Sequence, residues 1–417
     1  MHLLKYIFIV SGLSLMLACS DSDTDVQKAK ASTKLEAQSV VLPELLQRPE
    51  AIQNGKEWET VQNYYGKNKK ILASDSEDLM ARLELAQLFV QEARITGEHG
   101  YYYPAALKMT DDILDRNPTD QNVKFMTLAT RAGVELSQHE FEDALKTAQA
   151  AVQLNPYNAQ IYGALVDAYV ELGDYGKAVE MADKMVSIRP DLRSYSRVSY
   201  LREIHGEVEG AIEAMQMAVE AGAPGVEPTA WARLTLGDLY KNYGDLEKAE
   251  QQYQIILNER PDYPFAIAAL ADVEMEKGNY EKAETLLNEA KTIIPEVGFY
   301  EQLAHLYKKT NREAEMQAMI DEIFPMLEDD VVHGHNMNLE YAAIYKDLLE
   351  DHDKALEYVK KEYKKRPDNI DVNQLMAAIL VKQDKLAMAR PYVDQAGTTN
   401  SKNPELMELQ QMMRSQL

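Results

Sequence analysis

The chain has 417 residues, 46% of them hydrophobic, and its 44 Lys and Arg against 68 Asp and Glu give a formal net charge of −24. A charge of this sign repels nucleic acid and anionic lipid surfaces, so nucleic-acid binding is excluded as a function class. The sequence holds a single cysteine, which rules out an intrachain disulfide, and we expect the fold to rest on its apolar core.

Residues 1–18 predict a secretory signal peptide. His2 and Lys5 give the chain a short basic start, and the run from Tyr6 to Ala18 is mostly apolar. This run is shorter than the roughly 20 residues that a membrane-spanning helix needs, and it has the layout of a cleaved leader. The small residue Ala18 stands directly before Cys19, where a signal peptidase would cut.

Residues 15–19, LMLAC, resemble a bacterial lipobox, in which the cysteine becomes the acylated first residue of the mature chain. The resemblance implies that Cys19 carries three acyl chains, which would anchor the protein permanently in a membrane. The alternative is a soluble exported protein that is cut elsewhere.

Residues 19–42 predict a flexible acidic tether. After Cys19 this segment has no aromatic residue and is rich in Asp, Lys, Ser and Ala, a composition that buries too little apolar surface to order itself. Asp21, Asp23 and Asp25 alternate as in a calcium-binding EF-hand loop, but Val26 and Ser32 occupy the positions where that loop needs Gly and Glu. The acidic cluster after the cysteine also resembles an export signal that sends some lipoproteins to the outer face of the outer membrane.

Residues 43–75 are predicted to form a partial repeat unit that caps the start of the array, on the pattern of Trp58 and Tyr64-Tyr65 between Pro49 and Leu72. A repeat array needs such a cap because its terminal unit would otherwise expose an apolar face.

Residues 76–400 contain an internal repeat of two helical patterns. Segments 158–190, 229–261 and 264–295 each have two apolar periodic stretches split by a Gly-Asp or Gly-Asn pair, and each closes on a proline. The glycine is expected to end the first helix in a left-handed conformation, and the proline to stop the second. Prolines 156 and 190, like prolines 261 and 295, lie 34 residues apart.

A small residue recurs in the second helix of each predicted unit, where the two helices must approach closely. The recurring residues are Ala106, Ala144, Ala178, Ala211, Ala249, Ala283, Ala355 and Ala389, with Met316 in one divergent unit. A helix-turn-helix unit with this period and these small residues resembles the tetratricopeptide repeat (TPR). The resemblance implies an all-α helical-repeat solenoid of about nine units with capping helices at both ends.

The segment ITGEHGYYYPAAL, 95–107, breaks the period of the first full unit and is predicted to insert extra residues between its helices. Irregular loops on a repeat scaffold often carry binding function. Tyr101, Tyr102 and Tyr103 are therefore candidate binding residues, which could stack on a sugar or enter a protein groove. The alternative is that they fold back over the first repeat.

The first helices of the units are expected to line a concave groove. One equivalent groove position holds Asp167, Tyr200, Asp238 and Asp272, and its neighbours are Glu203, Trp231, Leu234, Phe265 and Met275. This acidic and aromatic set predicts a surface for a basic or extended segment of a protein partner. Alternatively, the acids are merely solvated and Trp231 packs between units. The Lys and Asn set that some TPR proteins use to hold a terminal carboxylate is not found at these positions.

Residues 194–250 resemble a narrower group. The stretch SYSRVS, followed by AGAPG and EPTAW, is similar to a broad family of bacterial TPR proteins whose molecular role is unassigned. The resemblance therefore bears on fold more than on function.

The search for catalytic motifs found no phosphate loop, zinc-protease motif or nucleophile elbow. His333 and His335 form the one pair with metal-like spacing, but they lie in a predicted linker without a clear acidic partner. We expect neither a cofactor nor a metal, and no catalytic residue is assigned.

Residues 401–417 are predicted to form an amphipathic capping helix, with Leu406, Leu409, Met412 and Met413 on one face. Together, the patterns favour a non-enzymatic scaffold lipoprotein of the bacterial outer membrane that holds a protein partner. They favour exposure at the cell surface over a periplasmic position. The alternative function is a glycan-binding accessory lipoprotein of a polysaccharide uptake system, suggested by 24 tyrosines and by a resemblance to glycan-binding lipoproteins that contain TPR units.

Overall fold

The computed structural model describes residues 42–414, and this part of the chain is all helical. The predicted signal peptide, Cys19 and all but the last residue of the predicted tether lie outside the described residues. The elements are η1 Glu50–Ile52, α1 Lys56–Ser74, α2 Leu79–Thr96, α3 His99–Asp115, α4 Gln121–Ser137, α5 Phe141–Leu154, α6 Ala159–Glu171, α7 Tyr175–Ile188, α8 Leu192–Ile204, α9 Val208–Glu220, α10 Glu227–Asn242, α11 Leu246–Glu259, α12 Pro264–Glu276, α13 Tyr280–Ile293, α14 Val297–Lys309, α15 Glu313–Val332, α16 Asn338–Asp347, α17 His352–Lys365, α18 Ile370–Lys382, α19 Leu386–Ala396 and α20 Pro404–Arg414. None of these helices combines the length and apolar composition that crossing a membrane requires.

Consecutive helices pack in pairs, from α2 with α3 (unit one) to α18 with α19 (unit nine). Helix α1 packs against α2 at one end, and α20 packs against α18 and α19 at the other. The prediction of an all-α solenoid of about nine units with an extra helix at each end is confirmed for the described part of the chain.

The turns inside the units follow the Gly-Asp pattern. Gly173 and Gly244 have φ values of 82° and 94°, a left-handed conformation that glycine adopts without steric cost. The next residue, Asp174 or Asp245, accepts a hydrogen bond from a backbone N–H in the first turn of the following helix. One dipeptide thus ends the first helix and caps the second.

The recurring alanines of the second helices are all fully buried, each with a relative exposure of 0%. Because alanine has a small side chain, its presence at this buried position lets the two helices of a unit approach closely. In unit seven, the corresponding Met316 is only partly buried and contacts two neighbouring core clusters. The predicted role of the small residues is therefore seen directly in the packing.

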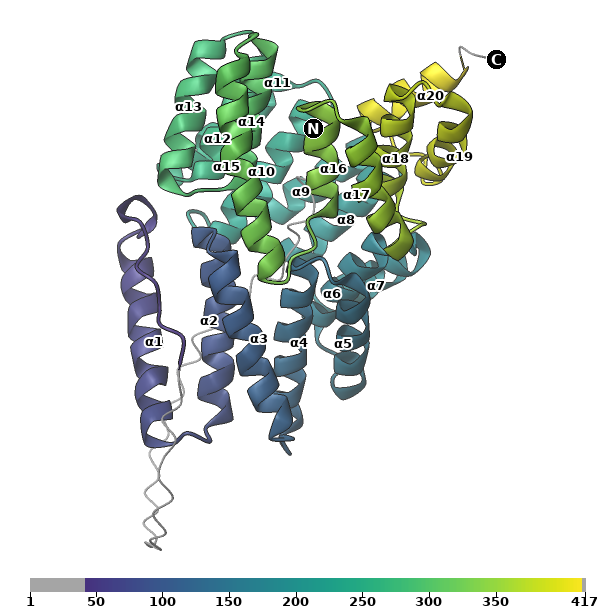
Figure 1. The fold of residues 1–417 in the computed structure, drawn as a ribbon. Coiled ribbons are helices and arrows are strands. Elements are labelled where there is room, and N and C mark those ends of the chain that lie inside the picture. The colour runs from purple at the N-terminus through teal and green to yellow at the C-terminus, as the bar shows by residue number, and fades with distance from the viewer. Residues whose placement is uncertain (1–41, 415–417) are drawn as a thin grey trace, which may run out of the picture.

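The solenoid turns back on itself, so that early and late units lie in two adjoining tiers (Figure 1). The turn inside unit two contacts the linker after unit seven, where the Asn336 backbone N–H donates to the Gln138 carbonyl over 3.1 Å. The turn inside unit three contacts the linker after unit eight, where the Asn369 side-chain amide donates to the Glu171 carbonyl over 3.0 Å. We call this line of contacts the seam. Each turn therefore meets the linker that follows the unit five places further along.

The prediction of an inserted loop at 95–107 is wrong, because most of this segment is helical. Helix α2 continues to Thr96 and α3 begins at His99, so the extra residues lengthen the two helices to 18 and 17 residues. Tyr102 and Tyr103 lie in the first turns of α3 with exposures of 0% and 1%. Burial of these two rings in the core of unit one favours helix over an open loop.

Candidate functional site

The acids of the predicted groove ladder are partnered inside the protein. Asp167 accepts hydrogen bonds of 2.9 and 2.6 Å from the Arg197 guanidinium, and Lys241 donates to Asp272 over 2.7 Å. Both ion pairs join the first helices of adjacent units, α6 with α8 and α10 with α12. These carboxylates therefore connect neighbouring units.

Two further members of the predicted set accept hydrogen bonds from tyrosines. Asp238 accepts from the Tyr253 hydroxyl over 2.7 Å, and Glu203 accepts from the Tyr243 hydroxyl over 3.2 Å. Tyr200, at the equivalent position of unit four, is buried, with burial raising its pKa well above the usual value. Tyr200 and Glu203 line a small cavity of about 40 Å³ at α8.

A larger cavity of about 270 Å³ lies on the inner face of the solenoid, where units five to eight face unit one. Its walls include residues of α3, α10, α12, α14 and α16, among them Tyr103, Trp231, Asp238, Phe265, Phe299 and Glu340. The structure thus brings together five of the predicted residues, Tyr103, Trp231, Leu234, Asp238 and Phe265. Asp167, Asp272, Tyr101 and Tyr102 do not line this cavity.

Three carboxyl groups of this cavity have no ion-pair partner among residues 42–414. Burial raises the pKa of Glu296 and of Glu301 to about 7. Burial also raises the pKa of Glu340 to about 8, with the Glu301 and Glu362 carboxylates adding to the shift. Desolvation disfavours the ionised form of each of these three groups.

Sequence reasoning missed these three glutamates because the predicted groove positions came from units three to six, whereas the glutamates lie in units seven and eight and in the linker before unit seven. The only signal was residue type: Glu296 stands in a linker, and Glu301 and Glu340 stand on the first helices of units seven and eight. An acidic chain holds many such residues, so the pattern did not single them out.

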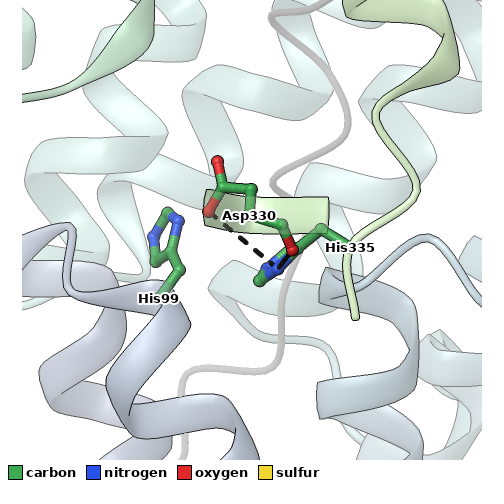
Figure 2. A group of neighbouring side chains, drawn as sticks. All are labelled: His99, Asp330 and His335. Carbon is green, nitrogen blue, oxygen red and sulfur yellow. Dashed lines mark hydrogen bonds and ion pairs between the residues drawn. The ribbon is translucent and has the colours of Figure 1, made fainter. Parts of the chain in front are cut away.

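The pair His333 and His335 does not form one site. The Nδ1 atom of His333 lies 2.7 Å from the Asp329 carbonyl, and its side chain is 36% exposed. His335 is 7% exposed and lines the cavity. Its neighbours there are His99 and Asp330 (Figure 2).

Comparison with known proteins identifies the repeat. Two family models, each described as a tetratricopeptide repeat, match residues 135–202 and 234–297. Cellulose synthase 1 operon protein C of Komagataeibacter xylinus is 26% identical over 176 residues, which are 39% of this chain and 13% of that protein. Small glutamine-rich tetratricopeptide repeat-containing protein 2 of Saccharomyces cerevisiae is 25% identical over 108 residues, 26% of this chain and 31% of that protein. The chain thus spans less than a third of the length of either relative.

Among solved structures, the APC/C hetero-tetramer Cut9-Hcn1 contains a similar solenoid. The match covers 87% of this chain and 68% of that one, with 14% sequence identity and a TM-score of 0.51. At this identity the likeness concerns the fold alone.

Proposed function

Because this chain is a tetratricopeptide-repeat protein, we propose that it is a non-enzymatic scaffold, anchored to the bacterial outer membrane through Cys19, whose inner cavity binds an extended basic segment of a protein partner. Repeat solenoids of this type use their concave surface to bind protein partners.

The observation that carries the proposal is the composition of the large cavity. Its aromatic residues Trp231, Phe265 and Phe299 offer apolar contacts, and Trp and other aromatic anchors dominate the energy of many interfaces. Burial raises the pKa of Glu296 and of Glu301 beside them. A Lys or Arg side chain entering the cavity would favour their ionised forms and so gain binding free energy.

The size of the cavity sets the kind of partner. A volume of about 270 Å³ lies just below the range of pockets that hold drug-sized molecules. It accommodates a few side chains of an extended segment and excludes a folded domain. The proposed partner is still a basic segment, but the acids proposed to select it are Glu296, Glu301 and Glu340 in place of the predicted ladder.

The membrane anchor is part of the proposal on the strength of the LMLAC motif at 15–19. Metabolic acyl labelling of the full chain and of a Cys19→Ala variant tests it, together with protease accessibility on intact cells. Labelling that depends on Cys19 supports the anchor, and digestion from outside supports surface exposure. Equal labelling of the two chains, or none, would contradict the anchor.

Affinity capture from solubilised envelope tests the cavity as the binding site. The wild-type chain is compared with Trp231→Ala and with Tyr157→Ala, since the Tyr157 side chain is 81% exposed and does not line the cavity. A partner recovered with wild type and Tyr157→Ala but lost with Trp231→Ala supports the proposal. Equal recovery with all three chains would place binding elsewhere.

The glycan alternative has less support from the side chains that suggested it. Tyr102 and Tyr103 are buried, and Tyr101 is 37% exposed, with its hydroxyl donating to the Glu44 carbonyl over 2.9 Å. A flat tyrosine platform for a sugar is therefore absent from this part of unit one.

A further inference from the structure

Three potential metal ligands from distant parts of the chain meet at the seam (Figure 2). His99 begins α3, Asp330 lies near the end of α15, and His335 stands in the linker to α16. One ligand atom from each residue lies within 4.8 Å of the other two. Ligand atoms around a bound Zn²⁺ lie roughly 3 to 4 Å apart, given bonds of about 2.0 to 2.2 Å, so side-chain shifts of about 1 Å would bring all three atoms within bonding distance of one ion.

His335 presents a ring nitrogen that is suited to bind a metal. Its Nδ1 atom lies 3.3 Å from the Asp330 carbonyl, and because a carbonyl can only accept, this contact places the ring proton on Nδ1. The Nε2 atom is then a lone-pair donor, and it is buried without a hydrogen-bond partner in the described part of the chain. A buried polar atom left without a partner costs free energy, and a metal ion would satisfy it.

The Tyr103 ring contacts both histidine rings of the cluster. The His99 ring stacks on Tyr103 with 5.4 Å between centroids and 15° between planes, and Tyr103 also contacts the His335 ring at 5.6 Å. Contacts that fix the orientation of ligand rings raise metal affinity. This stacking gives the buried Tyr103 a positioning role.

The donor set selects the class of ion. Two imidazoles and one carboxylate suit Zn²⁺ and neighbouring first-row transition metals, whereas Ca²⁺ and Mg²⁺ prefer oxygen ligands alone. All three residues line the large cavity, so further coordination positions would be open to water or to a bound partner.

We propose that His99, Asp330 and His335 form a binding site for one divalent transition-metal ion, with Zn²⁺ the best match, which joins unit one to the end of unit seven across the seam. The inference is independent of the partner-binding function, since it needs neither a basic segment nor a membrane anchor. An ion bound there stabilises the folded state because the unfolded chain does not bring the three ligands together.

The test uses the full-length chain, purified without a polyhistidine tag and stripped with a chelator. Calorimetric titration with Zn²⁺ measures stoichiometry and affinity, and the absorption spectrum after Co²⁺ addition reports nitrogen and oxygen coordination. The expected result for wild type is one ion per chain and a melting temperature that rises with Zn²⁺.

Variants then assign the ligands. His99→Gln, Asp330→Asn and His335→Gln are each expected to weaken Zn²⁺ binding at least ten-fold. His333→Gln is the matched control, because His333 is two residues from His335 but is not one of the three grouped ligands, and it should retain wild-type affinity. Far-UV circular dichroism checks that each variant is folded. If His335→Gln is unfolded, the Zn²⁺ affinity of His99→Gln tests the site instead, because the His99 side chain is partly exposed.

Two outcomes would overturn the site. One is a wild-type chain that binds no ion in calorimetry and shows no Co²⁺ spectrum. The other is loss of binding in His333→Gln with full binding in His99→Gln, which would assign the metal to the sequence neighbours His333 and His335.

Discussion

Arg366 joins units three and eight at the seam. Its guanidinium pairs with Glu171 from unit three and with Glu362, and the Arg366 and Glu362 side chains are only 3% and 1% exposed. It also lies over the Phe141 ring, 4.6 Å from the centroid. Such a buried cation compensates two carboxylates that have little access to water.

We predict that Arg366→Ala destabilises the protein by about 3 to 5 kcal/mol, because two buried carboxylates lose their cation. The adjacent Lys365→Ala is the matched control, since its ion pair with Glu140 is about half exposed on both sides and is worth at most about 1 kcal/mol. Chemical denaturation of the two variants measures the difference. Equal loss of stability in both would show that the Arg366 cluster does not hold the seam.

Glu340 gives the stability of the chain a pH dependence. Burial raises its pKa to about 8 in the folded protein, so between its ordinary pKa and pH 8 the folded state binds more protons than the unfolded state. The free energy of unfolding should therefore fall as pH rises through this range and level off above it.

The variant Glu340→Gln cannot ionise, and we expect it to be more stable than wild type at pH 8.5 by more than about 1 kcal/mol. Near pH 4.5 the two chains should differ little. Thermal melting across this pH range checks the prediction, with Glu357→Gln at an exposed position as control. A wild-type profile that rises toward pH 8.5 in parallel with the variant's would contradict the assignment.

For single residues, the sequence correctly predicted the buried alanines of the second helices, but it did not predict that the groove carboxylates are partnered inside the protein. The alanines recur once in each unit, so their shared packing role can be inferred from their spacing in the sequence. Asp167 looked like an open groove carboxylate because its partner, Arg197, stands one repeat further along. A pattern of equivalent positions does not reveal which charges pair across units.

Among the helices, the packing of α10 on α11 depends on a glycine. A Cβ atom at Gly237 would lie 2.3 Å from Cε1 of the fully buried Tyr253 ring, whose hydroxyl donates to Asp238 in the cavity wall. The absence of a side chain at this position lets the two helices approach closely.

Gly237→Ala is expected to cost about 1 to 3 kcal/mol, since the Tyr253 ring must move in a packed core. Gly66→Ala in α1 is the control, because nothing lies within 4 Å of its added Cβ, and its higher helix propensity should stabilise the protein by about 0.5 to 1 kcal/mol. Denaturant midpoints of the two variants measure both effects. If Gly237→Ala stabilised the chain as Gly66→Ala does, the close contact would not constrain the helix pair.

Helix existence and pairing were predictable from periodicity, glycine turns and terminal prolines. The error at 95–107 arose because GEHGYYYP has two glycines and a proline, which favour a turn in isolation. In the structure, burial of Tyr102 and Tyr103 outweighs that local preference. Tertiary packing therefore makes this segment helical although its glycines and proline favour a turn.

For the whole molecule, the closing of the solenoid creates the site. The contact between Gln138 and Asn336 joins residues 198 positions apart in the sequence, because small rotations between units add up over five units. Neither the cavity nor the His99, Asp330 and His335 cluster could be derived from repeat patterns, since those patterns describe one unit and its neighbours. The concave aromatic residues Trp231 and Phe265 were predictable, and the glutamates that line the same cavity, Glu296, Glu301 and Glu340, were not.

Trp231 provides the most direct measurement of partner binding in the closed cavity. The chain has two tryptophans, and the variant Trp58→Phe leaves Trp231 as the single fluorophore, since Trp58 is buried in the packing of α1. Titration of this variant with a Lys-rich extended peptide and with a Glu-rich peptide of equal length should give saturable emission changes for the Lys-rich peptide alone. Unchanged emission with both peptides, or equal responses to the two, would contradict a cavity that selects basic segments.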